Sequence, residues 1–366
     1  MNKQIIILKN VGRALAAKHM TKARNTVVRG KPKKDSVRKF GKMFFREACK
    51  PFMKVDRRAR PSGYCFKHGR RCVVTRSTLP NGLRGCVAGA TCSDWSSMGG
   101  EEGWGGDSAL VFLCFLREMR YQNFDFIIIE NTALFDESGL EPLLEYYDKV
   151  TLKFSPVLLG IPVQRVRKYM ILTRRGVLQW RDEVTKLGHM QAFKLVFGRR
   201  VMMKGVDMAR APAEMLGAYK QEMCDRRGMT RTRPDNTEMS FFQCSSAAVR
   251  NQIIAHEDKV IPAHGKYPPL VCNLRQKPEF VAATEMVPAL LQRSLLWNLA
   301  SRRPLLPSEH LEMMGFNMFG PHRCSVAAAL DALPESQQRS VAGSTMHSAA
   351  MGCVFMFLLS GAVRCS

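Results

Sequence analysis

The feature that most constrains the fold is an apolar run at residues 124–129, interrupted only by Asp125. Its aromatic and β-branched side chains are typical of a strand that is covered on both faces. Residues with helical or strand-like spacing surround this run: helices are expected at 108–120 and 137–147, a short buried strand at 84–90, and further strands at 150–154 and 168–173. Strands and helices that alternate in this way predict an α/β fold with an open sheet in roughly residues 60–180.

The length of 366 residues corresponds to about two domains. The sequence pattern divides the chain into four segments: a disordered basic arm at 1–60, the sheet-containing core at 61–180, a smaller irregular domain or insertion at 181–304, and C-terminal helices at 305–366 that return to the core. Within the last segment, helices are expected at 307–314, 325–333 and 346–359.

The net charge of +25 is unevenly distributed. Residues 1–60 hold 19 Lys and Arg against 3 Asp and Glu, which gives +16, and the other residues carry only +9. Such an arm attracts polyanions through counterion release, so nucleic acid is the first expected partner and an anionic membrane surface the second. A solvated arm without a specific partner is the plain alternative.

The basic arm also bears on localisation. Its cluster of basic residues resembles a nuclear import signal and comprises Lys31, Lys33, Lys34, Arg38 and Lys39. The segment before Asp35 contains no acidic residue and equally resembles an organelle transit peptide. We expect a nuclear protein, with an organelle as the alternative.

One apolar stretch, at residues 349–363, is interrupted by Gly352, Ser360 and Gly361. It is shorter than the roughly 20 residues that span a bilayer, so we expect a buried helix and no transmembrane segment.

The twelve cysteines show no paired spacing, which favours a reducing compartment over a disulfide framework. The tightest group is Cys65, His68 and Cys72, with Cys86 further along the chain. This group is a weak candidate for structural zinc, because it lacks the two short-spaced ligand pairs of most zinc sites.

Two residues at predicted strand ends are candidates for chemistry. Cys92 follows the strand at 84–90 and begins a loop rich in glycine and serine, where a thiol could be an exposed nucleophile or an inert buried side chain. Glu130 ends the apolar run, where burial raises the pKa of a carboxyl group and would suit it to donate a proton. Its plain alternative is a capping or salt-bridging role. The loop glycines form no phosphate loop, because no Gly-Lys-Ser/Thr follows them.

Together, these residues resemble the cytosine-5 DNA methyltransferase family over about residues 60–360, and most closely the divergent methyltransferase-like proteins that occur in dinoflagellates. The family's Pro-Cys-Gln and Asp-Phe-Ser loop corresponds to Thr-Cys-Ser-Asp-Trp-Ser at 91–96. Its Glu-Asn pair corresponds to Glu130 and Asn131, which begin 38 residues after Cys92.

Three further stretches carry the resemblance. The family's Gly-Val-Pro-Gln-x-Arg-x-Arg is matched by Gly-Ile-Pro-Val-Gln-Arg-Val-Arg at 160–167, which puts Arg165 and Arg167 in register. Its Thr-Pro-Glu and Gly-Phe-Pro resemble Leu-Pro-Ser-Glu at 306–309 and Gly-Phe-Asn at 315–317. Its terminal Gly-Asn is matched by Gly343 and Ser344.

The resemblance implies a Rossmann-like core that depends on S-adenosylmethionine and methylates carbon 5 of cytosine in DNA. It assigns the nucleophile that attacks carbon 6 to Cys92, the acid at ring nitrogen 3 to Glu130, and the group that holds the base carbonyl or a phosphate to Arg167, with Arg165 beside it. The target base would have to leave the duplex. The cofactor contacts implied are Asn131, Gly343 and Ser344.

The sequence departs from the family at the cofactor turn. In the family, the cofactor site begins with a strand and a Phe-x-Gly-x-Gly turn. Residues 1–91 contain no such motif, so the core could lack its first strand and turn. Three explanations stay open: a diverged turn, a sequence that begins after the turn, or loss of activity. The alternative function is therefore an inactive relative that binds nucleic acid through its basic arm.

Overall fold

The computed structural model describes residues 42–43, 62–65, 69–73, 82–90, 93–96, 102–106, 108–232 and 237–365. The chain forms two compact units. Unit 1 comprises Met1–Lys153, Arg167–Met190 and Leu358–Ser366, and unit 2 comprises Phe154–Val166 and Gln191–Phe357. These units do not follow the boundaries drawn at residues 180 and 304, because most of the C-terminal segment groups with unit 2.

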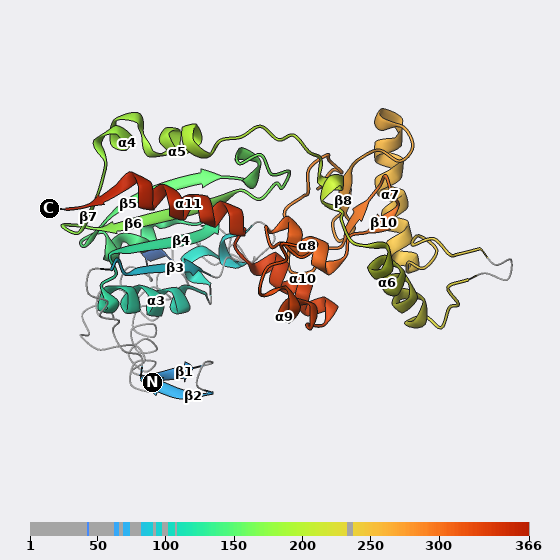
Figure 1. Cartoon of the computed structure of the whole chain (residues 1–366), viewed down its shortest axis with the longest axis horizontal. Coiled ribbons are helices and arrows are strands. Elements are labelled where there is room, and N and C mark those ends of the chain that lie inside the picture. The colour runs from blue at the N-terminus through green and yellow to red at the C-terminus, as the bar shows by residue number, and fades with distance from the viewer. Residues whose placement is uncertain are drawn as a thin grey trace, which may run out of the picture. The chain divides into compact units, whose positions relative to one another are not determined.

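Unit 1 is built on a four-stranded sheet in the order β3-β4-β6-β5 (Figure 1). Its strands are β3 (Gly85–Gly89), β4 (Phe126–Thr132), β5 (Tyr147–Phe154) and β6 (Arg167–Arg174). β3 runs parallel to β4, and β4 runs antiparallel to β6. The expected α/β class is confirmed, with a mixed sheet.

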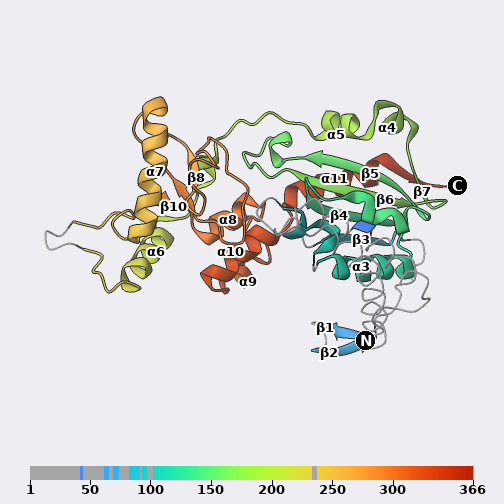
Figure 2. The same cartoon turned by 180° about the vertical axis from the view of Figure 1, so that it is seen from behind.

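All seven residues of β4 are buried, which confirms the strand covered on both faces. Ile127 and Ile129 belong to the core cluster on one face, together with Leu113 and Leu116 of α3 (Ser108–Gln122). The two opposite views both place α3 beside β3 and β4 (Figures 1 and 2). The helix expected at 108–120 is thus confirmed.

The helix expected at 137–147 is present but shorter: residues 137–143 form a 3-10 helix with Pro142 inside it, and Tyr147 already begins β5. One expectation for unit 1 is wrong. The strand expected to be buried at 84–90 is half exposed, with Val87 at 42% exposure, because β3 is the end strand of the sheet in the part of the chain that is described.

Two small sheets complete unit 1. β7 (Leu178–Trp180) pairs with the C-terminal β11 (Ala362–Arg364), and α4 (Asp182–Leu187) follows β7. β1 (Ser62–Cys65) and β2 (Arg70–Val73) form an antiparallel hairpin with Cys72 opposite Gly63. His68 of the zinc candidate lies outside the described residues, and within those residues no three His, Cys, Asp or Glu are grouped to hold a metal. The zinc site stays a prediction.

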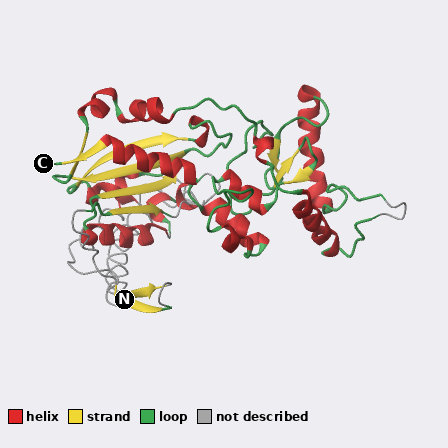
Figure 3. Ribbon diagram, viewed as in Figure 1, coloured by secondary structure: helices red, strands yellow, loops and turns green. Residues whose placement is uncertain are grey.

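Unit 2 is mainly helical with a small sheet in the order β10-β9-β8 (Figure 3). Its strands are β8 (Val271–Asn273), β9 (Leu296–Asn298) and β10 (Arg303–Pro304). Its helices are α5 (His189–Phe197, which begins in unit 1), α6 (Ala213–Asp225), α7 (Ala247–His264), α8 (Pro307–Met313), α9 (Ala327–Asp331), α10 (Glu335–Ser344) and α11 (Ser348–Gly361, which ends in unit 1). The helices expected at 307–314, 325–333 and 346–359 are confirmed as α8, α9 and α11, whereas α10 and the helices of the supposedly irregular segment were not expected.

Among the described residues, the stretch Glu335–Gly361 is long and apolar enough to cross a membrane by length and composition, with 33% of its apolar window buried. It consists of two successive helices, α10 and α11. A single stretch of this kind is weak evidence for a membrane span, because core helices of soluble proteins share the same composition.

Candidate active site

The candidate site begins where the parallel strands β3 and β4 end together. Their register places Gly89 of β3 opposite Glu130 of β4. The next residue is Ala90 after Gly89 and Asn131 after Glu130. The Asn131 Nδ2 donates to the Ala90 carbonyl oxygen at 3.4 Å. The carboxyl ends of parallel strands are where α/β proteins usually place their chemistry.

Thr132, the next residue of β4, forms a hydrogen bond with the segment that follows Cys92 in the sequence. The Thr132 Oγ1 donates to the Trp95 carbonyl oxygen at 3.1 Å. Cys92 itself lies outside the described residues, between Ala90 and Ser93. Two consecutive residues of β4 therefore bond the two flanks of the loop that contains Cys92.

The downstream flank is also fixed by packing and by a carboxylate. The Trp95 ring lies 4.8 Å from Trp104 and 4.9 Å from Phe135, centroid to centroid. The buried Asp94 Oδ2 accepts hydrogen bonds from the backbone N–H of Ser108 at 3.0 Å and from the Ser108 hydroxyl, at the first residue of α3. A carboxylate at a helix N-terminus is favoured by the helix dipole.

Gly106 permits this arrangement. A Cβ on that residue would lie 2.2 Å from the Asp94 Cγ, so a larger residue would displace the carboxylate. The glycine-rich stretch near the Cys92 loop is therefore closely packed at its C-terminal end. The sequence pattern did not indicate this role for Asp94, which lies 14 residues before the first residue of the helix that it contacts.

Glu130 and Arg167 form an ion pair at the same sheet end. In the antiparallel register, Glu130 is opposite Tyr169 and Thr132 is opposite Arg167, so the pair lies diagonally across one face of the sheet. The Arg167 Nε lies 3.0 Å from the Glu130 Oε1, and the two side chains are only 14% and 10% exposed. Burial of both charges makes each dependent on the other.

Arg165 belongs to unit 2 and has a different set of partners. Its guanidinium donates to the carbonyl oxygens of Leu290 at 2.9 Å, Gly343 at 3.3 Å and Thr345 at 3.0 Å. It is 3% exposed, and these bonds fasten the end of α10 to the 290–292 segment. Arg165 and Arg167 thus make their described contacts in different units.

The residues expected to contact a cofactor are likewise divided. Asn131 belongs to unit 1, and its Oδ1 accepts from the Thr132 N–H at 2.8 Å. Gly343 and Ser344 belong to unit 2, where a Cβ on Gly343 would lie 2.3 Å from the Gln292 nitrogen and the Ser344 Oγ accepts from Gln292 at 2.9 Å. Each of these three residues makes the contacts described within its own unit.

Comparisons with known proteins give similarity to solved structures only. No protein-family model matches this chain, and no curated protein matches it significantly. Similar solved structures include the Dnmt2 methyltransferase of S. pombe, with 14% identity, a TM-score of 0.37, and coverage of 76% of this chain and 77% of that chain.

Two further similar structures come from other organisms. The Entamoeba histolytica methyltransferase EhMeth has 14% identity and a TM-score of 0.37, and covers 76% of this chain and 77% of its own. A mutant of the Spodoptera frugiperda DNMT2 has 12% identity and a TM-score of 0.36, and covers 75% and 79%. Because these scores are low, we base the proposed function on the residues of the site. None of these three is from a dinoflagellate, so that part of the resemblance stays a prediction.

Proposed function

We propose that this chain is a DNA (cytosine-5)-methyltransferase-like protein in which the Cys92 thiolate adds to carbon 6 of a cytosine. The observation that supports this most is the attachment of both flanks of the Cys92 loop to Asn131 and Thr132. These two residues directly follow Glu130, whose carboxylate is paired with Arg167. The resemblance assigns a nucleophile and an acid to these positions, and the fold brings their strands side by side.

The chemistry of this site can be written without a methyl donor. Attack of the Cys92 sulfur forms an S–C6 bond and moves the C5=C6 electron pair to carbon 5, while the protonated Glu130 carboxyl group donates its O–H to ring nitrogen 3 and stabilises the adduct. Carbon 5 then accepts a proton from solvent. Loss of the original C5 hydrogen as a proton and release of the thiolate restore the ring, so the net result is exchange of the C5 hydrogen. Arg167 positions the Glu130 carboxyl group.

The resemblance also implies S-adenosylmethionine, which would supply a methyl group from its sulfonium when bound. The three residues assigned to it lie in two units and make their hydrogen bonds and packing contacts within the protein. Each of the three is thus already engaged in a contact of its own unit. We therefore derive no step through this group.

Hydrogen exchange at carbon 5 tests the proposal directly. The full chain is incubated with cytosine-containing DNA in deuterated water, and deuterium at carbon 5 is measured by mass spectrometry of the released nucleosides. We expect exchange with the wild-type chain, none with Cys92→Ser, and unchanged exchange with Cys86→Ser, a matched change on β3. Exchange that survives Cys92→Ser, or its absence in the wild type, overturns the adduct.

Methyl transfer needs a separate measurement. Binding of S-adenosylmethionine and covalent trapping on 5-fluorocytosine DNA, abolished by Cys92→Ser, would show a complete methyltransferase. Exchange without trapping would show base activation alone. Tight, salt-sensitive DNA binding with neither reaction would point to the alternative, an inactive relative that binds through the +16 arm at residues 1–60. Nuclear localisation is proposed on that arm alone.

A further inference from the structure

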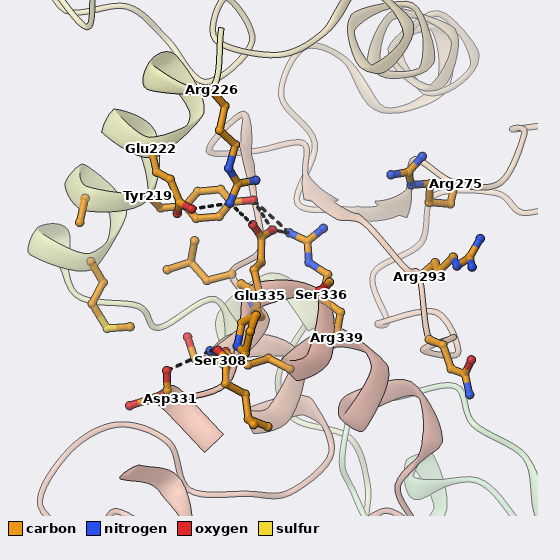
Figure 4. A pocket seen from close by; sticks show the side chains of 18 residues that line it. Tyr219, Glu222, Arg226, Arg275, Arg293, Ser308, Asp331, Glu335, Ser336 and Arg339 are labelled. Carbon is orange, nitrogen blue, oxygen red and sulfur yellow. Dashed lines mark hydrogen bonds and ion pairs between the residues drawn. The ribbon is translucent and has the colours of Figure 1, made fainter. Parts of the chain in front are cut away.

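A cavity lies wholly within unit 2 and has a volume of about 880 Å³. α6, α8 and α10 line it, together with the segments that follow β8 and precede β9 (Figure 4). Its size is in the range of pockets for small ligands, which is roughly 300–1,000 Å³. It can therefore take one nucleotide-sized molecule but not a double helix.

One wall of the cavity is a closed, charge-balanced network. The Glu335 carboxylate accepts from the Tyr219 hydroxyl at 2.9 Å and from Arg226 at 2.9 Å, and it pairs with Arg339 at 2.6 Å. Arg226 also pairs with Glu222. Burial raises the pKa of Tyr219 to about 12, so its hydroxyl stays protonated and donates to Glu335. Two arginines and two glutamates compensate each other here.

The opposite side carries uncompensated positive charge. Arg275 and Arg293 line the cavity across from this network, as Figure 4 shows, and both are exposed. Neither forms an ion pair with any residue that the structure describes. The remaining acidic residue of the lining, Asp331, is paired with Arg323. The net charge open to a ligand is thus that of two guanidinium groups.

Buried polar contacts hold the backbones of these two arginines together. The Asn273 Oδ1, which is fully buried, accepts from the N–H of Arg275 and from the N–H of Leu295, both at 3.2 Å. The Ser294 Oγ accepts from Asn273 Nδ2 at 3.2 Å and from the N–H of Leu291 at 2.8 Å. The two loops are therefore preorganised, so little backbone ordering is required when a ligand binds.

The chemistry of the lining indicates the ligand class. Guanidinium groups bind phosphate through paired, charge-assisted hydrogen bonds. Apolar side chains also line the cavity, at Met215, Leu306 and Leu333, which suits a flat, weakly polar ring. The Glu222 carboxylate at the rim can accept from a ring N–H or amino group.

We propose that this cavity binds a nucleoside phosphate, with the phosphate on Arg275 and Arg293 and the base toward Met215 and Leu333. The site goes beyond the proposed function, since it lies in unit 2 and uses none of Cys92, Glu130 or Arg167. The nucleotide is supplied either by a single-stranded or extruded segment of nucleic acid or by the free mononucleotide pool. Both sources offer the same phosphate and base.

Binding measured on the full chain with Cys92→Ser tests this site independently of catalysis. The probes are deoxycytidine 5′-monophosphate, a short single-stranded oligodeoxynucleotide, deoxycytidine and inorganic phosphate. The test variant is Arg275→Ala/Arg293→Ala. The matched control is Arg199→Ala/Arg200→Ala, which removes two exposed arginines of unit 2 that do not line the cavity.

We expect the test variant to weaken nucleotide binding about tenfold or more and the control to leave it unchanged, because only the former removes the paired phosphate contacts. Binding of the mononucleotide assigns the site to the free pool, and binding of the oligonucleotide alone assigns it to a strand. Equal affinity of test variant and control, binding of inorganic phosphate as tight as that of the nucleotide, or no binding by any probe overturns the proposal.

Discussion

Two buried Glu–Arg pairs, one in each unit, differ in how they are enclosed. In unit 2, Glu309 is 0% exposed and takes two contacts from Arg303, at 2.7 and 2.8 Å, and two more from the N–H groups of Leu306 and Ala211, at 2.7 and 2.8 Å. In unit 1, the Arg167 Nε lies 3.0 Å from the Glu130 Oε1, and the pair lies where β4 approaches its carboxyl end. A fully enclosed bidentate pair suits a role in stability, whereas a pair at the end of a sheet suits a role with a ligand.

Glu130→Gln should have the largest effect and should act on activity. The amide keeps the shape of the side chain but cannot serve as the acid at the base, so we expect C5 hydrogen exchange to fall by about 10²–10⁴-fold. Deuterium incorporation into cytosine measures it. If Glu130→Gln exchanged the C5 hydrogen as fast as the wild type, Glu130 would have no role in activity.

Glu309→Gln should instead act on stability. It leaves the buried Arg303 without its charge partner, and breaking such a pair costs about 3–5 kcal/mol. Urea unfolding of the full chain gives the change in the free energy of unfolding. The control is Glu285→Gln, whose pair with Lys204 is exposed and is expected to contribute about 0–1 kcal/mol. Equal losses in the two variants would contradict the structural role of Glu309.

Acid should weaken unit 2 through its buried histidines. Burial lowers the pKa of His310 from 6.5 to about 3, and burial with the nearby Arg165 lowers the pKa of His347 from 6.5 to about 4. The unfolded chain therefore binds more protons below pH 6.5, so stability is lost as the pH falls from 6.5 toward these values. The expected slope is about 1.4 kcal/mol per pH unit for each histidine.

The test of this slope is denaturant unfolding at pH 7, 6 and 5. His310→Leu should reduce the loss of stability between pH 6.5 and 5 by about 2 kcal/mol, since it removes one buried histidine whose pKa is lowered. A pH dependence that is the same in the variant as in the wild type would show that His310 does not titrate in this way.

Asp94→Asn should have the smallest effect. It removes the charge that receives the Ser108 N–H and hydroxyl at the start of α3, which should cost about 1–2 kcal/mol of unfolding free energy. Asp148→Asn is the control, because its pair with Arg175 is more than half exposed on both sides. Thermal unfolding of both variants measures the difference, and no difference would show that the Asp94 contacts do not stabilise the fold.

Much of the sheet could be predicted from the sequence, because β4 is apolar throughout and α3 has helical spacing. Periodicity also predicted α8, α9 and α11. It missed α7, although Ser246 caps that helix through the Val249 N–H at 3.2 Å, a local signal that was present. The exposed face of β3 could not be predicted, since exposure depends on which strands are neighbours.

The candidate site was predictable only in part. Glu130 and Gly89 lie opposite each other on β4 and β3. These two strands are consecutive in the main sheet, so the sequence pattern could indicate both of them. By contrast, Arg165 and Arg167 are indistinguishable in the motif, and the Arg165 partners lie 125, 178 and 180 residues further along the chain. No local pattern reports contacts over such separations.

The distance along the chain from Arg165 to its partners also has a consequence for synthesis. At roughly 5–20 residues per second, a ribosome needs about 10–40 seconds to progress from Arg165 to Thr345. During that interval the set of acceptors is incomplete, because the carbonyl oxygens of Gly343 and Thr345 have not been made. Unit 2 therefore closes late in translation, when the end of α10 emerges, and a nascent chain stalled before that point presents an unfinished domain to chaperones.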